Sequence, residues 1–214
     1  MKDNGNEWVS IGDLMASVVA VVMLLLVVSV LQQTYAEIKY KEELSKSVAN
    51  QKVVIENIFN NMKESLKNEN LETLAEFNFV ESKISFKDGL FERGSAIITP
   101  KARKAFLKSQ DKIVEFLKQV PNGKILVEGH TDNLPVLKPV IDIETYGAVY
   151  DDNFTLSAAR AREARKHIIG TLDKELANRI IVTGYGDSCP VNKENPSDAA
   201  NRRVEIRFTI DTEK

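Results

Sequence analysis

One long apolar run constrains this chain more than any other feature. The run extends from Leu14 to Leu31, carries no charge, and contains only two serines as polar residues. Coiled into a helix at about 1.5 Å per residue, it spans roughly 27 Å, close to the hydrocarbon thickness of a bilayer. Trp8, just upstream, is the kind of side chain that lies at a membrane interface. The sequence therefore predicts a single transmembrane helix over residues 9–33, after a short tail of residues 1–8.

A cleaved secretory signal peptide is the competing interpretation of this run. Such a peptide begins with a basic segment, has a shorter apolar core, and ends at a small-x-small cleavage site. Here the run is followed by Gln32, Gln33 and Thr34 instead. These residues favour a helix that stays in the membrane.

Asp13 lies at the front edge of the apolar run. A carboxyl group within or at the rim of a transmembrane helix costs on the order of 2.5 to 3.5 kcal/mol, unless it faces a protein interior or a water-filled path. One interpretation is that Asp13 works in an ion path. The other is that it lies in the headgroup layer and caps the helix, with Leu14 as the first helical residue. Residue chemistry alone leaves both open.

The remainder of the chain is long enough for one compact domain and a connector. The net charge of -2 and the lack of a basic cluster argue against nucleic acid as a partner, because binding phosphates requires concentrated Lys and Arg. Cys189 is the single cysteine, so an intramolecular disulfide is excluded. Charges on the two sides of the apolar run are balanced and do not determine its orientation.

Residues 34–76 form the predicted connector, which contains neither Pro nor Gly. Its apolar residues recur at helical spacing, and Val48, Ile55 and Met62 fall seven apart. The pattern predicts a helix and leaves two arrangements open. One is a short coiled coil, and the other is an amphipathic helix that lies on its own domain or on the membrane surface.

Residues 77–214 alternate strand and helix signals. Thr99 can cap a helix that begins at Pro100, for example. Two helices packed on one face of a small mixed sheet, in the order β-α-β-α-β-β, make the predicted fold an α+β domain. The predicted strands are residues 79–86, 124–129, 180–185 and 203–210, and the predicted helices are residues 100–120 and 156–172.

Four short motifs occur in this domain. They are Phe91-x-x-Gly94-Ser95-Ala96, Gly129-His130-Thr131-Asp132-Asn133, Asn153-x-x-Leu156-Ser157-x-x-Arg160-Ala161 and Asn201-Arg202-Arg203-Val204-Glu205-Ile206. Their content and order resemble the OmpA-like peptidoglycan-binding domain over about Phe79 to Ile210. The resemblance implies a site for the diaminopimelate-containing stem peptide of peptidoglycan.

The residue types in these motifs suit a ligand that carries both an ammonium and a carboxylate. Asp132 can pair with the ammonium, while the Arg160 guanidinium donates two parallel hydrogen bonds to the carboxylate. Backbone N–H groups at the helix start, near residues 153–157, are expected to add anion affinity. The alternative for Asp132 and Arg160 is a buried salt bridge that only positions a loop. By motif match, the resemblance implies that the same pocket is also lined by Thr131, Asn153, Leu156 and Arg203.

The N-terminal pattern of Trp8, Ser10, Asp13, Leu14 and Met15 resembles the B subunits of ion-driven rotary stators. That group includes flagellar MotB and the ZorB subunit of the Zorya anti-phage system. The resemblance implies a homodimer whose helices lie inside a ring of five multi-spanning MotA/ZorA-like A subunits, with Asp13 relaying protons or sodium ions. It further implies a bacterial inner-membrane protein with a cytoplasmic N-terminus and a periplasmic domain on the cell wall, in which residues 34–49 can plug the ion path.

Within this group, the short tail without a basic cluster and the pair Ile11-Gly12 before the aspartate favour a Zorya-type subunit over a flagellar one. The loop over residues 133–152 is longer than in the shortest OmpA-like domains, which favours a stator over a simple outer-membrane anchor. A passive tether between membrane and wall is the remaining alternative.

The sequence predicts no catalytic or metal site. His130 and His167 are the only histidines, and neither has a nucleophile at motif spacing. Combining His130 with nearby aspartates such as Asp132, Asp151 and Asp152 gives no zinc or calcium ligand spacing. We therefore expect no enzymatic activity, no cofactor and no metal ion.

Overall fold

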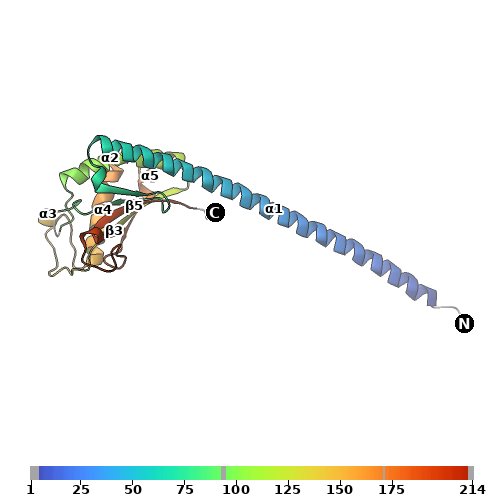
Figure 1. Ribbon diagram of the computed structural model, residues 1–214. Helices are drawn as coiled ribbons and strands as arrows, with labels where there is room; N and C mark the ends of the chain where they lie inside the picture. Colours follow the sequence, from blue (N-terminus) through green and yellow to red (C-terminus); the bar gives the residue numbers. More distant parts are fainter. Residues whose placement is uncertain (1–4, 93–94, 171, 212–214) are drawn as a thin grey trace. The chain divides into compact units, whose positions relative to one another are not determined.

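The computed structural model describes residues 5–92, 95–170 and 172–211 (Figure 1). The described chain divides into two compact units, one up to Asn50 and one from Gln51 onward. The first helix, α1 (Gly5–Asn68), contributes residues to both units.

The described part of the first unit is the stretch of α1 up to Asn50. Every side chain from Trp8 to Asn50 is exposed, including the whole apolar run. The helix is long and apolar enough to cross a membrane. Within the run, the Ser17 hydroxyl donates to the carbonyl of Leu14 at 2.8 Å, so this polar group needs no partner from outside the helix.

Asp13 lies inside α1. The helix begins at Gly5, about two turns before Asp13. An N-cap residue has a non-helical backbone and directly precedes the first helical residue. The interpretation of Asp13 as a cap, with Leu14 as the first helical residue, is therefore wrong.

The second unit is built on a five-stranded mixed sheet. Its strands are β1 (Ala75–Asn78), β2 (Lys83–Phe86), β3 (Gly123–His130), β4 (Ile180–Gly184) and β5 (Arg203–Ile210). Its helices are α2 (Pro100–Gln119), α3 (Ile143–Tyr146), α4 (Asn153–Ile169) and α5 (Lys174–Asn178). The strand order is β1-β2-β5-β3-β4, in which only β3 and β4 are parallel. Apolar side chains of α2 and α4 share one core with the strands, and the predicted α+β fold is confirmed.

The predicted strand over residues 79–86 is partly wrong. The structure has a hairpin of β1 and β2, joined by a turn over residues 79–82. The Asn78 side-chain oxygen accepts the Glu81 N–H at 2.9 Å, and Ser82 has a positive φ of 51°, which reverses the chain. Phe79 lies in the turn but still packs against the core. The alternation of apolar residues therefore extends beyond the strand itself.

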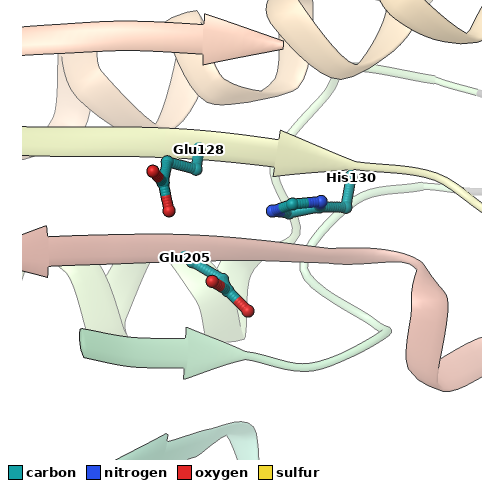
Figure 2. A group of neighbouring side chains, drawn as sticks. All are labelled: Glu128, His130 and Glu205. Atoms are coloured by element: carbon teal, nitrogen blue, oxygen red, sulfur yellow. The ribbon is translucent and has the colours of Figure 1, made fainter. Parts of the chain in front are cut away.

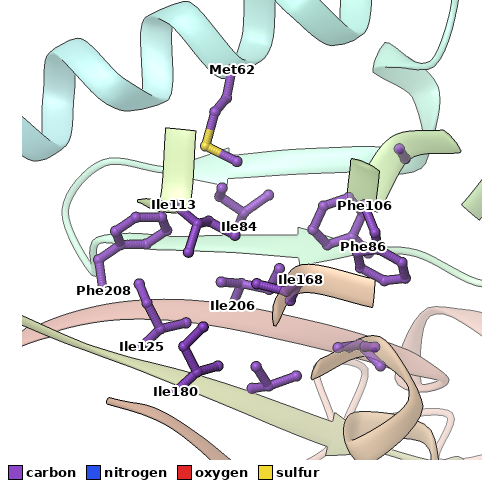
Figure 3. Close-up of a cluster of buried hydrophobic side chains, with 14 of the residues drawn as sticks. Met62, Ile84, Phe86, Phe106, Ile113, Ile125, Ile168, Ile180, Ile206 and Phe208 are labelled. Atoms are coloured by element: carbon purple, nitrogen blue, oxygen red, sulfur yellow. The ribbon is translucent and has the colours of Figure 1, made fainter. Parts of the chain in front are cut away.

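The core of the second unit includes the C-terminal part of α1 (Figure 3). Phe59 meets Phe208 of β5 edge to face, with ring centroids 5.0 Å apart, and Met62 is fully buried. This part of the connector is therefore a helix packed on its own domain, one of the two arrangements that the sequence left open. The compact unit begins at Gln51, earlier than the predicted boundary at residue 77. The buried α1 residues are Ile55, Ile58, Phe59, Met62 and Leu66.

Candidate functional site

A pocket of about 700 Å³ opens in the second unit, where β3 ends and where α4 and β5 begin. Residues 87–92 and the long loop over residues 133–152 complete its wall. The structure brings together in this pocket all six residues that the sequence assigned to a binding site. They are Thr131, Asp132, Asn153, Leu156, Arg160 and Arg203.

Arg160 on α4 lines the pocket and is only 7% exposed. Its Nε donates to the carbonyl of Ser95 at 3.0 Å, and its guanidinium lies over the Phe91 ring, 5.3 Å from the centroid. No carboxylate among the described residues forms an ion pair with it. Burial lowers the pKa of Arg160, yet a guanidinium stays charged in a protein. The pocket therefore contains a buried positive charge that an anionic ligand can neutralise.

Asp132, just after β3, is buried as well, and its partner is Arg202. Arg202 donates from Nη1 to Oδ2 of Asp132 at 2.7 Å. The same guanidinium donates to the two carboxylate oxygens of Asp88, at 3.1 and 2.8 Å. The two acids raise the pKa of Arg202, Asp88 contributing most. The alternative of a direct salt bridge between Asp132 and Arg160 is wrong for the described chain, because Asp132 pairs with Arg202 instead.

Arg202 lies within one of the four motifs, but the residue pattern predicted no role for it. The two consecutive arginines where β5 begins were a usable signal, because successive side chains of an extended chain point in opposite directions. Arg203 is buried beside Glu205, and Arg202 points the other way and binds Asp88 and Asp132. Asp88 is more than a hundred residues away in the chain, so no local pattern linked it to Arg202.

Three other predicted residues shape the pocket. The backbone N–H of Thr131 donates to the carbonyl of Gly186 at 2.8 Å, and its buried Oγ1 has no hydrogen-bond partner among the described residues. The side chain of Asn153 donates to the carbonyl of Asp132 at 3.2 Å, which ties the start of α4 to the end of β3. Leu156 adds a buried apolar surface.

The N-terminus of α4 differs from expectation. The helix begins at Asn153, three residues before the predicted start, because Asp152 caps it. Asp152 accepts the Thr155 N–H at 2.6 Å through its side chain and the Leu156 N–H at 3.0 Å through its carbonyl. The Asp152 carboxylate thus already lies at the positive end of the helix dipole, and the Thr155 and Leu156 N–H groups are occupied. The anion affinity of this helix start stays a prediction, and Arg160 is the buried cationic group of this part of the pocket.

Arg203 is mostly engaged by the protein itself. Its Nε donates to Glu205 at 2.7 Å, and its terminal nitrogens donate to the carbonyls of Cys189 and Asn201 at 3.2 and 3.4 Å. It therefore joins β5 to the segment that precedes this strand. Its contribution to the pocket is to form part of the wall.

Glu128, His130 and Glu205 form a buried cluster on β3 and β5 (Figure 2). Their potential ligand atoms lie within 4.8 Å of one another, a feature that sequence reasoning missed because Glu205 is remote in the chain. The two carboxylates already have cationic partners at 2.7 to 3.5 Å, which balances their charge without a metal ion. These partners are Lys83, Arg203 and Arg207.

His130 is the neutral member of this cluster. Its ring stacks on Tyr185, with centroids 5.1 Å apart and an interplanar angle of 10°. Neither ring nitrogen has a hydrogen-bond partner among the described residues. Burial lowers the pKa of His130 to about 4, and the positive charge of Arg203 acts in the same direction.

Acidification is expected to destabilise the second unit through His130. The unfolded chain takes up a proton at His130 near pH 6.5, whereas the folded chain does so only near pH 4, so stability falls as the pH falls between these values. Between pH 7 and pH 5 the expected loss is about 2 kcal/mol. Chemical denaturation at the two pH values measures it. In His130→Asn the loss should shrink, and by more than in His167→Asn, since burial also lowers the pKa of His167. An unchanged loss in His130→Asn would contradict this assignment.

Asp13 belongs to the first unit and lies on the exposed surface of α1. Among the described residues, none donates a hydrogen bond to its carboxylate. Its neighbours on the same helix face, Val9, Ser10, Ala16 and Ser17, are exposed as well. A single copy of the described chain therefore leaves this acid uncovered at the edge of the apolar run.

Known proteins resemble this chain in sequence and in fold. A family model described as the OmpA family matches residues 90–203. The chain is 26% identical to the Zorya protein ZorB of Escherichia coli, over 99% of this chain and 90% of that protein. A MotB-like protein from Desulfovibrio vulgaris has a similar fold, with a TM-score of 0.56 and 20% identity over 75% of this chain and 99% of that one. The cell wall anchor of the T6SS from Pseudomonas aeruginosa reaches a TM-score of 0.49 with 26% identity, over 70% and 96% of the two chains. The chain belongs to the OmpA family.

Proposed function

We propose that this chain is the B-type subunit of an ion-driven rotary motor in the bacterial inner membrane, with its C-terminal domain anchored to peptidoglycan. The observation that carries the proposal is the combination of two features on one chain. These are an exposed helix of membrane-spanning length that contains Asp13, and a pocket in which buried Arg160 forms no direct ion pair with an acid of the described residues. The similarity to ZorB extends over both features.

In the pocket, the ligand is the diaminopimelate-containing stem peptide. Arg160 binds a carboxylate of the diamino acid through two parallel hydrogen bonds, which neutralises the buried guanidinium. The neighbouring ammonium pairs with Asp132, which Arg202 already holds in place. Thr131, Asn153, Leu156 and Arg203 complete the contact surface.

In the membrane, Asp13 binds and releases the coupling ion. Two copies of the chain place their helices within a ring of five multi-spanning A subunits, which covers the exposed apolar face of α1 and gives Asp13 a hydrated path. A membrane potential supplies about 2.3 kcal/mol per elementary charge per 100 mV, enough to bias this cycle. The wall-bound domain holds the helices still, so the A subunits turn around them.

The orientation follows from the location of peptidoglycan. The N-terminus lies in the cytoplasm, α1 crosses the inner membrane once, and the second unit lies in the periplasm. No cofactor, metal ion or catalytic step enters this mechanism, and residues 34–49 are available to close the ion path before the domain reaches the wall.

The biological setting that we propose is Zorya-type anti-phage defence. Similarity to ZorB over nearly the full length of both chains supports it. The flagellar alternative, a MotB-like stator subunit, requires the same two activities and differs in the process that the motor serves. A passive tether requires the wall site alone and no ion relay.

Complementation of a deletion strain tests the proposal as a whole. Phage protection should return with the wild-type chain and fail with either Asp13→Asn or Arg160→Gln, because the motor needs both the ion relay and the wall grip. Immunoblots of membrane fractions control for expression. Full protection by Asp13→Asn together with failure of Arg160→Gln would indicate a tether, and full protection by both variants would contradict the proposal entirely.

A further inference from the structure

Three charged side chains of the pocket form a continuous series of ion pairs, from Asp88 through Arg202 to Asp132. Arg202 donates two hydrogen bonds to Asp88, at 3.1 and 2.8 Å, and one to Asp132, at 2.7 Å. One guanidinium therefore serves two carboxylates, and Asp88 takes the larger share of its hydrogen bonds. The three groups together keep one uncompensated negative charge.

Two other cations that line the pocket are paired with acids outside its lining. Lys87 pairs with Glu76 at 3.0 Å, and Arg203 pairs with Glu205. Neither cation forms an ion pair with an acid of the series in the described chain. Glu92, which also lines the pocket, is exposed and is itself an acid. Arg202 is therefore the cation that determines how much negative charge the series presents to a ligand.

The Asp88 carboxylate is held beside Arg202 by a turn that does not depend on this ion pair. The carbonyls of Gly89 and Leu90 accept from the hydroxyl and the backbone N–H of Thr99, both at 2.9 Å. The Asp88 side chain itself is half-exposed. A substitution that removes its charge and keeps its shape should therefore leave this turn in place.

Asp132 retains room for a ligand. Its Oδ2 accepts from Arg202, and its Oδ1 accepts the Leu134 N–H at 3.2 Å. A carboxylate offers about four lone-pair sites, so about two of them are left for a ligand ammonium. The attraction depends on charge, because a carboxylate that one guanidinium neutralises completely attracts a second cation only weakly.

We propose that Asp88 is a positioning residue, which binds most of the Arg202 guanidinium and so keeps the Asp132 carboxylate negative for the ligand ammonium. The inference rests on the proposed wall-binding function and concerns how its acidic group is kept available. Without the charge of Asp88, Arg202 and Asp132 would form a neutral pair. The ligand ammonium would then compete with a guanidinium for the single remaining acid of the series.

Calorimetry with free diaminopimelate, on the full-length chain in detergent, tests this inference. Asp88→Asn keeps the shape of the side chain and should bind diaminopimelate about tenfold more weakly than the wild type. The double variant Asp88→Asn/Arg202→Gln also removes the competing guanidinium and should recover an affinity within about threefold of the wild type. Glu115→Gln is the matched control, because it removes an ion-paired acid of α2 outside the pocket, and it should bind as the wild type does.

The recovery in the double variant is the decisive measurement. If Asp88 contacted the ligand itself or only supported the fold, a second substitution would not restore affinity. A double variant that binds as weakly as Asp88→Asn would therefore overturn the inference, as would wild-type affinity in Asp88→Asn, and in both cases the wall-binding function stands. If the wild type does not bind diaminopimelate, the proposed function fails and this inference fails with it.

Discussion

Replacing Arg160 with glutamine is expected to abolish retention of the chain on isolated peptidoglycan. Arg160 is buried and forms no ion pair with an acid of the described residues, although Asp88 and Asp132 act on it electrostatically, so a ligand carboxylate can still bind it directly. Removing one member of a buried, hydrogen-bonded charge pair costs about 2 to 5 kcal/mol, a loss of at least about 30-fold in affinity. Co-sedimentation of the detergent-solubilised full chain with purified sacculi, over a range of protein concentrations, measures this loss.

Arg162→Gln is the matched control for this substitution. Arg162 lies on the same helix and loses the same charge, but its side chain is 63% exposed and it does not line the pocket. We expect it to bind sacculi as the wild type does. Arg160→Lys should bind with intermediate affinity, because it retains the charge but loses the planar fork. If Arg160→Gln is retained on sacculi as the wild type is, with an unchanged melting temperature, the pocket does not bind peptidoglycan.

Replacing Asp13 with asparagine is expected to stop ion flux through the assembled complex. Asparagine has nearly the same shape but cannot take up and release a proton or balance a sodium ion, so the relay has no carrier group. Membrane vesicles that contain the chain with its A-type partner provide the assay. A potential is imposed, and the internal pH or sodium concentration is followed with a fluorescent dye.

Two variants in the same turn of α1 give this experiment its controls. Asp13→Glu retains the carboxyl group and should keep part of the flux, because the longer side chain displaces the acid. Ser17→Ala removes a hydroxyl that already bonds within the helix, to the carbonyl of Leu14, and should leave the flux unchanged. Equal flux in wild type and Asp13→Asn would remove the ion relay from this account.

The parts of the fold that follow from local chemistry were predictable from the sequence. Thr99 caps α2 and Pro100 begins it, as the order of these two residues predicts. Strand β5 extends from Arg203 to Ile210, as its alternating pattern indicates. The six residues of the pocket were predicted from the content and order of the four motifs. No rule of sequence spacing by itself places Asp132 and Arg160 on one wall.

The parts that depend on remote partners were not predictable. The connector pattern fits a coiled coil and a domain-packed helix equally, and only contacts such as Phe59 with Phe208 distinguish them. Arg202 binds Asp88 and Asp132, which precede it by 114 and 70 residues, so neither acid reveals its partner locally. The turn over residues 79–82, which Asn78 stabilises, replaced the first half of one predicted strand. Phe79 in this turn is apolar and packs on the core, so the alternating pattern did not reveal the turn.

Purification of the chain with the product of its neighbouring gene tests whether it is a subunit of a rotary motor. The two proteins are expressed together, extracted in mild detergent, and counted by native mass spectrometry. We expect a multi-spanning partner in a ratio of five copies to two of this chain, with the two copies enclosed by the ring. A chain that purifies alone, or with no multi-spanning partner, would contradict the motor and leave only attachment to the cell wall.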